Sequence, residues 1–130
     1  LISVNEHDHN NVVDIARDLM DLGFTIMTTD GTGATLTEAG LDITPVNKVW
    51  EGKPHIVDHI KQNQIQLIIN TPLGKNARDD DYVIRRAAIE HDVPCITTLS
   101  AAWAAVKAIR ALRDEGISVK SLQEWHAELK

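Results

Sequence analysis

The stretch of sequence that decides the fold reads Met27-Thr28-Thr29-Asp30-Gly31-Thr32-Gly33-Ala34-Thr35-Leu36. The residues just before it, from Phe24 to Thr28, have the bulk and β-branching of a short buried strand. The apolar residues after the glycines begin a helical pattern that ends at Gly40, a typical C-terminal cap. The chain therefore passes from a strand into a helix through a turn that contains two glycines and several hydroxyl groups.

The same turn predicts a phosphate cradle. The first turn of a helix has unpaired N–H groups and the positive end of the helix dipole, which together favour an anion. Gly31 and Gly33 allow the backbone to approach a ligand closely, and Thr29 and Thr32 add hydroxyl donors. An ordinary turn is the alternative, because Thr and Asp cap helices and glycine makes turns. The stretch lacks the third glycine of a dinucleotide fingerprint and the Gly-Lys-Ser/Thr of a Walker P-loop.

Strand and helix patterns alternate along the rest of the chain. The expected strands are Leu1–Val4, Phe24–Thr28, Ile43–Val49, Gln66–Asn70 and Pro94–Thr98. Helical patterns cover residues 12–22, residues 34–40 and a segment from Pro54 to about Gln64. A further helix is expected to begin among Asp79, Asp80 and Asp81, and a long one, with Ile109 and Leu112 in its apolar stripe, ends at Gly116. A closing helix is indicated by a capping box at Ser121 and Glu124.

This alternation predicts an α/β fold, a three-layer α/β/α sandwich of Rossmann type with a parallel sheet. Right-handed crossovers on either side of the first strand give the strand order 3-2-1-4-5, with the switch point between strands one and four. Residues 1–130 are predicted to form a single domain. Ligands of such sheets bind beyond the carboxyl ends of the strands, where both glycine-containing turns lie.

Composition limits the classes of partner and the cellular compartment that the chain fits. The net charge is −6, which disfavours nucleic acid as a partner, and no apolar run has the length of a membrane span. A single cysteine, Cys95, fits a reducing cytoplasm, and its apolar neighbours predict a packing role for its side chain. The chain opens inside a strand without a methionine, so we expect it to be a segment of a longer polypeptide.

Polar groups suited to a phosphate ester gather at the expected strand ends. Lys48 supplies a cation, and Asn70 with Thr71 supplies an amide and a hydroxyl. Asp80, expected near the start of its helix, has a carboxylate that can accept hydrogen bonds from ribose hydroxyls or a base. Together with the glycine-rich turn, these residues predict a site for an anionic ligand.

Four motifs resemble one family. They are Val46-Asn47-Lys48-Val49-x-Glu51-Gly52-Lys53-Pro54-His55-Ile56, Ile69-Asn70-Thr71-Pro72-x-Gly74-Lys75, Ile84-Arg85-Arg86-Ala87-Ala88 and Thr97-Thr98-Leu99. In this order they are similar to the methylglyoxal synthase-like domain at the C-terminus of the carbamoyl-phosphate synthetase large subunit. The resemblance covers the chain from Leu1 to Lys130.

The resemblance implies a regulatory domain, without catalytic residues or cofactors, in an ATP-dependent ligase of pyrimidine and arginine biosynthesis. Such domains bind UMP or IMP and pass the signal to the other domains of the large subunit, which pairs with a glutaminase small subunit. Association of this chain with further copies of itself is also compatible with the resemblance. The family's phosphate contacts fall on Thr29, Gly31, Thr32, Lys48, Asn70 and Thr71. Its ribose or base contacts fall on Ser3, Val49, Asp80 and Ile84.

This sequence also departs from the family pattern. His9 stands where enterobacterial members have a further lysine, Pro72 replaces a threonine, and Ile96 replaces an acidic residue that helps to hold ornithine. The alternative function is that of a methylglyoxal synthase-type lyase acting on dihydroxyacetone phosphate. Lys53 stands where those enzymes place the catalytic aspartate, which leaves Glu51 and His55 as conceivable bases.

Overall fold

The computed structural model describes residues 1–129, and residues 75–78 only as backbone. Its five strands form one parallel sheet with the order β3-β2-β1-β4-β5. The strands are β1 (Ile2–Val4), β2 (Ile26–Thr28), β3 (Ile43–Pro45), β4 (Ile68–Thr71) and β5 (Cys95–Ile96). The α/β class, the parallel sheet and the predicted strand order are therefore confirmed.

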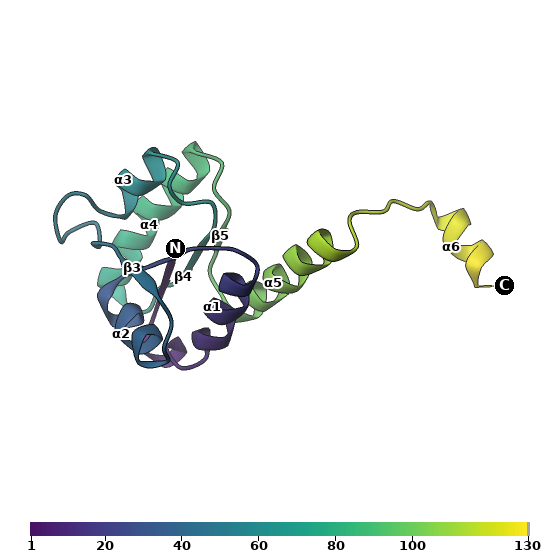
Figure 1. Cartoon of the computed structure of the whole chain (residues 1–130). Coiled ribbons are helices and arrows are strands. Elements are labelled where there is room, and N and C mark those ends of the chain that lie inside the picture. Colours follow the sequence, from purple (N-terminus) through teal and green to yellow (C-terminus); the bar gives the residue numbers. More distant parts are fainter. Residues whose placement is uncertain (130) are drawn as a thin grey trace.

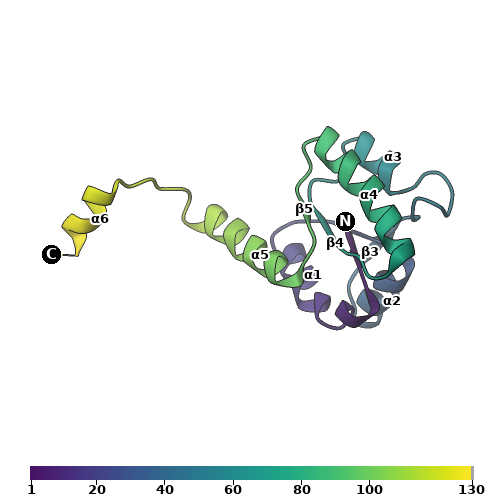
Figure 2. The same ribbon diagram turned by 180° about the vertical axis from the view of Figure 1, so that it is seen from behind.

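Helices cover both faces of the sheet (Figure 1). The helical elements are η1 (Glu6–Asp8), α1 (Val12–Asp21), α2 (Asp30–Glu38), α3 (Ile56–Lys61), α4 (Lys75–Glu90), α5 (Leu99–Asp114) and α6 (Leu122–Glu128). Figure 2 shows from behind that α3 and α4 lie together on one face, opposite α1 and α5. None of these helices is both long and apolar enough to cross a membrane within the described residues.

Two apolar clusters hold the layers together. One joins the sheet to α1, α2 and α5 and contains the fully buried Ile15, Leu36 and Val106. The other joins the sheet to α3 and α4 around Ile60 and Ala88. Consecutive β4 residues face opposite clusters, as the two-residue period of a strand covered on both sides requires.

The register brings the carboxyl ends of the central strands to one edge. Val4 pairs with Thr71, Ile2 with Thr28, and Thr28 with Pro45, so the turns after β1, β2, β3 and β4 leave the sheet side by side. This edge is where the sequence places the candidate site.

The turn after β2 depends on a close approach between strand and helix. A Cβ atom added at Gly33 would lie 2.6 Å from the buried hydroxyl of Thr28, closer than real Cβ atoms come to any neighbour. Glycine therefore allows α2 to lie directly against β2. The helix ends as predicted, with Ala39 as its C-cap and the Gly40 N–H bonded to the carbonyl of Thr37.

Several predicted boundaries are wrong. The third strand ends at Pro45 and does not reach Val49, leaving Asn47 in an isolated bridge with His55. The next helix begins at Ile56 with His55 as its N-cap, so Pro54 precedes it, and it ends at Lys61. The following helix begins at Lys75 because Gly74, with φ of 88°, provides the change of direction at its N-cap. Asp79, Asp80 and Asp81 thus lie beyond its first turn.

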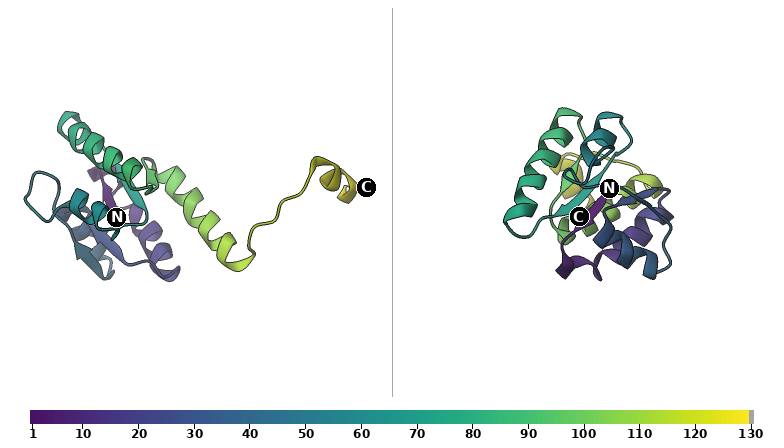
Figure 3. Two further views of the ribbon diagram at one scale, coloured as in Figure 1. Left: turned by 90° about the horizontal axis from the view of Figure 1, so that it is seen from above. Right: turned by 90° about the vertical axis from the view of Figure 1, so that its left-hand side faces the viewer.

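The C-terminal segment extends away from the body. Figure 3 shows α5 leading off the sheet, followed by an extended stretch and then α6, which stands apart from the other helices. Every residue from 111 to 129 is exposed, so the predicted apolar stripe of α5 is buried at Ala102 and Val106, while Leu112 is left in solvent. The predicted capping box of α6 is present, with Ser121 and Glu124 bonded to each other's backbone N–H groups.

Candidate functional site

A cleft of about 420 Å³ opens at the carboxyl edge of the sheet. Its walls come from the residues that follow β1, β2, β3 and β4, and from the inner side of α4. All the residues predicted as phosphate, ribose or base contacts line it: Ser3, Thr29, Gly31, Thr32, Lys48, Val49, Asn70, Thr71, Asp80 and Ile84. The structure therefore brings this set together in one cavity, although the residues come from sequence positions as far apart as 3 and 84.

The N-terminus of α2 meets the cleft at Gly31 and Thr32. The N-cap residue, Thr29, has extended backbone, and its side chain makes no capping hydrogen bond. Its hydroxyl lies 2.9 Å from that of Ser3 at the end of β1. Because the first N–H groups of a helix have no acceptor within the helix, the first turn of α2 keeps donors that an anion can use.

Two of the predicted hydroxyl donors already bind the backbone. The hydroxyl of Thr32 accepts from the Val4 N–H at 3.0 Å and donates to the Val4 carbonyl at 3.4 Å. The hydroxyl of Thr71 accepts from the N–H and the side-chain amide of Asn5, each at 3.0 Å. Thr32 therefore fixes the end of β1, whereas Thr71 keeps its hydrogen for a further acceptor.

Asn70 is part of a buried polar network. Its side-chain N–H donates to Asp81 at 2.8 Å, and the other oxygen of Asp81 pairs with Arg85 at 2.7 Å. Asp81 is 8% exposed and lines the cleft, yet the residue predicted from the sequence is its neighbour Asp80. The missed signal is helical spacing, since Asp81 lies three residues before the buried Ile84 and four before its ion-pair partner.

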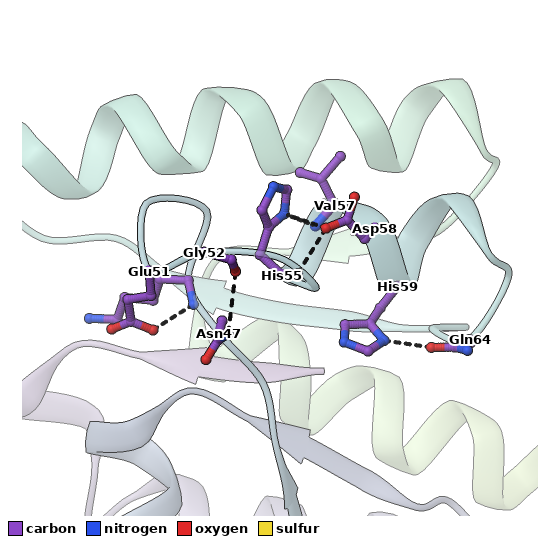
Figure 4. Close-up of polar contacts among 9 residues, drawn as sticks. Asn47, Glu51, Gly52, His55, Val57, Asp58, His59 and Gln64 are labelled. Carbon is purple, nitrogen blue, oxygen red and sulfur yellow. Dashed lines mark hydrogen bonds and ion pairs between the residues drawn. The ribbon is translucent and has the colours of Figure 1, made fainter.

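Lys48 lies in a loop between β3 and α3 that is closed by its own hydrogen bonds (Figure 4). Its backbone N–H donates to the Glu51 carboxylate at 2.7 Å, and the Asn47 side chain donates to the Gly52 carbonyl at 3.3 Å. The Lys48 ammonium lies 5.9 Å from the centre of the Trp50 ring, within cation–π range. Trp50 also lines the cleft and was not predicted from the sequence.

The loop ends in the capping box of α3, also drawn in Figure 4. The His55 ring accepts from the Val57 N–H at 3.2 Å, and the His55 N–H donates to Asp58 at 2.9 Å. This backbone hydrogen bond, with the positive charges of Lys53 and Lys61 nearby, lowers the pKa of Asp58. Glu51 and His55, the conceivable bases of the lyase alternative, thus hold the loop and the helix start, and neither is among the residues lining the cleft.

The charge in the cleft is mixed. Among lining residues with described side chains, Lys48 is the sole lysine or arginine, with His9 beside Gly31 as a further nitrogen group. The carboxylates of Glu6, Asp80 and Asp81 also line it. Within the described part of the chain, no group of three or more His, Cys, Asp or Glu residues is placed to hold a metal ion.

Cys95 lies outside the cleft lining, on β5, and is partly buried. Burial raises the pKa of its thiol, and the negative charge of Asp81 raises it further. A thiol with a raised pKa stays protonated at neutral pH and is a poor nucleophile. The predicted packing role of Cys95 accords with this environment.

Comparison with known proteins places the chain in a family. The family described as "MGS-like domain" matches residues 11–97. The chain is 49% identical over 127 residues to the carbamoyl phosphate synthase large chain, C-terminal section, of Methanopyrus kandleri, covering 97% of this chain and 23% of that protein. It is 42% identical over 127 residues to the carbamoyl phosphate synthase large chain of Rhodopirellula baltica, covering 98% of this chain and 12% of that protein.

The fold has a solved counterpart. A methylglyoxal synthase from Elizabethkingia anophelis superposes with a TM-score of 0.64 at 17% identity, covering 81% of this chain and 75% of that one. Identity this low supports the fold and nothing finer. The large-chain relatives are much longer than this chain, which spans only 12% of the Rhodopirellula protein. The matched family, the relatives and the sheet order together confirm the resemblance seen in the sequence: the chain belongs to the MGS-like domain family.

Proposed function

We propose that this chain is the effector-binding domain of a carbamoyl-phosphate synthetase large chain, and that its ligand is a nucleoside monophosphate, UMP or IMP. The observation that carries the proposal is the convergence of the α2 N-terminus, Lys48 and Asn70 on one cleft. A phosphate there meets backbone donors, a cation and an amide, which is the set that phosphate recognition requires. The relatives, which are synthetase large chains, support the rest of the proposal.

The proposed phosphate subsite is built from three elements. The first turn of α2 offers N–H groups at Gly31 and Thr32, and Lys48 offers a charged donor from the loop after β3. Asn70 and Thr71 complete it from the end of β4. Charge-assisted hydrogen bonds of this kind are about twice as strong as neutral ones, so Lys48 carries a large share of the affinity.

The ribose and base then lie toward α4. Asp80 provides an acceptor for ribose hydroxyls, and Val49 with Ile84 provides apolar contact for a base. Ser3, whose hydroxyl is paired with that of Thr29, lines the cleft from β1. This arrangement supports a phosphate ester of a nucleoside, rather than a free phosphate, as the ligand.

Regulation follows from linkage. A nucleotide shifts a conformational equilibrium only by its difference in affinity for the two states, typically about 1–3 kcal/mol. The second state involves the other domains of the large chain and its glutaminase partner, in an enzyme that supplies carbamoyl phosphate to pyrimidine and arginine synthesis. A reducing cytoplasm is the compartment we propose, since the sequence has one cysteine.

Thermal unfolding with UMP and with uridine tests this proposal. UMP at about 100 times its dissociation constant should add about 2.7 kcal/mol to the stability of the chain, and uridine should add much less. Lys48→Ala should lose most of the UMP effect, whereas Lys107→Ala, an exposed lysine on α5, should keep it. Equal stabilisation by UMP and uridine would refute the phosphate subsite.

The proposed domain has no catalytic role of its own. Lys53 is exposed, and the Glu51 carboxylate accepts the Lys48 N–H, so the loop offers no free carboxylate near the cleft. A positioned general base is worth about 10²–10⁴-fold in rate, so we expect no methylglyoxal from dihydroxyacetone phosphate above the uncatalysed background. Product that disappears in Glu51→Ala or His55→Ala would instead establish the lyase alternative.

A further inference from the structure

Trp50 is a large aromatic side chain in the cleft that the phosphate contacts do not use. It is 70% exposed, and it lines the cleft from the loop between β3 and α3. Single exposed apolar residues are common on protein surfaces, so this exposure alone assigns no role. Two further observations assign a role to Trp50.

The first observation is that the loop carrying Trp50 is closed by hydrogen bonds. The bridge between Asn47 and His55 closes its base, and the Glu51 N–H donates to the Lys48 carbonyl at 3.0 Å. Figure 4 shows the contacts of Asn47 and Glu51 on either side of Trp50 in the sequence. Trp50 therefore lines the cleft from a closed loop that is anchored to the start of α3.

The second observation is the relation between Trp50 and Lys48. The ammonium lies over the ring at 5.9 Å from its centre, so a ring face is directed toward the cation proposed to bind phosphate. A phosphate that is held by Lys48 brings the base of a nucleotide within reach of the indole. The same cleft has apolar lining at Val49, Ile56 and Ile84.

We propose that Trp50 is the residue that recognises the base, by stacking its indole on the nucleobase of a phosphate-anchored nucleotide. The inference rests on the proposed function, since the phosphate subsite brings the base to the ring. Stacking tolerates any base because every base has a π-face. Trp50 thus selects nucleotides over sugar phosphates and discriminates little between uracil and hypoxanthine.

Calorimetric titration of the chain with UMP and with ribose 5-phosphate separates this role from phosphate binding. Trp50→Ala should weaken UMP about tenfold, within the range that alanine substitution gives for base stacking, and should leave ribose 5-phosphate within about twofold. Trp50→Phe keeps an aromatic face and should retain most of the UMP affinity. Trp125→Ala is the matched control, because Trp125 is 54% exposed and lies on α6, away from the cleft.

Each other outcome is decisive. Equal weakening of both ligands by Trp50→Ala would mean that the ring only orients Lys48, and the stacking role would be overturned. Unchanged UMP affinity in that variant would overturn it while leaving the proposed function standing. If the unaltered chain bound neither ligand, the proposed function would fail, and the inference with it. Unfolding midpoints confirm that the variants are folded.

Discussion

At the scale of single residues, Asp81 links α4 to the end of β4 at the carboxyl edge of the sheet. Its carboxylate accepts from the Asn70 amide and pairs with Arg85, so it fixes the orientation of a side chain proposed to contact the ligand. Asn70 is itself 7% exposed. Removing Asp81 would leave this buried donor without its acceptor, which is costly because a buried polar group loses water without gaining a partner.

We therefore predict that Asp81→Ala lowers the free energy of unfolding by about 1–3 kcal/mol, measured by urea denaturation. Asp79→Ala removes an exposed carboxylate from the same helix and should change stability by less than about 0.5 kcal/mol. If both substitutions had similarly small effects, the Asn70–Asp81 hydrogen bond would contribute less to the free energy of unfolding than its burial indicates.

Residues lining the candidate site were predictable where the backbone alone places them. Thr29 and Lys48 follow β2 and β3, and Asn70 lies near the end of β4. Parallel strands bring such positions to one edge of the sheet, independently of the contacts that their side chains make. Side-chain partners were not predictable in this way. The Thr32 hydroxyl binds the backbone of Val4, 28 residues away, and nothing in the local sequence marks that pairing.

At the scale of elements, the packing of α2 on β2 depends on Gly33. Alanine normally stabilises a helix relative to glycine by about 1 kcal/mol. Here the added Cβ would meet the Thr28 hydroxyl at 2.6 Å, inside a fully buried contact that cannot open without shifting the helix. Overpacking of this kind typically costs about 1–3 kcal/mol, which exceeds the gain in propensity.

Gly33→Ala should therefore lower the unfolding midpoint in urea by an amount equivalent to up to about 2 kcal/mol, the overpacking cost less the gain in propensity. Gly31→Ala, in the same helix, meets only the edge of the His9 ring at 3.3 Å and should leave stability unchanged or slightly raised. The prediction is wrong if both alanines stabilise the chain to the same extent.

Element boundaries show what local signals can and cannot decide. The end of α2 and the α6 capping box followed from residues adjacent in sequence, and both predictions were confirmed. The start of α4 was mispredicted because three consecutive aspartates resemble a first turn, whereas Gly74 had already turned the chain into the helix. Asp81 is used in the tertiary network with Asn70, which no helix-start rule anticipates.

At the scale of the whole molecule, the C-terminal arm, residues 117–129, is distinct from the body. Ile117, Val119 and Leu122 are 79%, 90% and 74% exposed, and α6 has no buried residue. The arm is held by contacts within itself, among them the ion pair between Lys120 and Glu128 and the Ser121–Glu124 capping box. Its removal should not disturb either apolar cluster.

A chain that ends at Gly116 should thus keep its free energy of unfolding within about 0.5 kcal/mol of the full chain, as expected for changes away from the core. Its response to UMP should also be unchanged. A loss of several kcal/mol in chemical denaturation would show that the arm packs on the body.

The central claim is that the N-terminus of α2 binds the phosphate of a nucleotide. Backbone amide NMR of the chain, titrated with UMP and separately with uridine, tests it most directly, because it observes the Gly31 and Thr32 N–H groups themselves. We predict that UMP shifts both resonances strongly, that uridine does not, and that Lys48→Ala suppresses the effect of UMP. Resonances of Gly31 and Thr32 that stay in place while saturating UMP shifts amides elsewhere would contradict the claim.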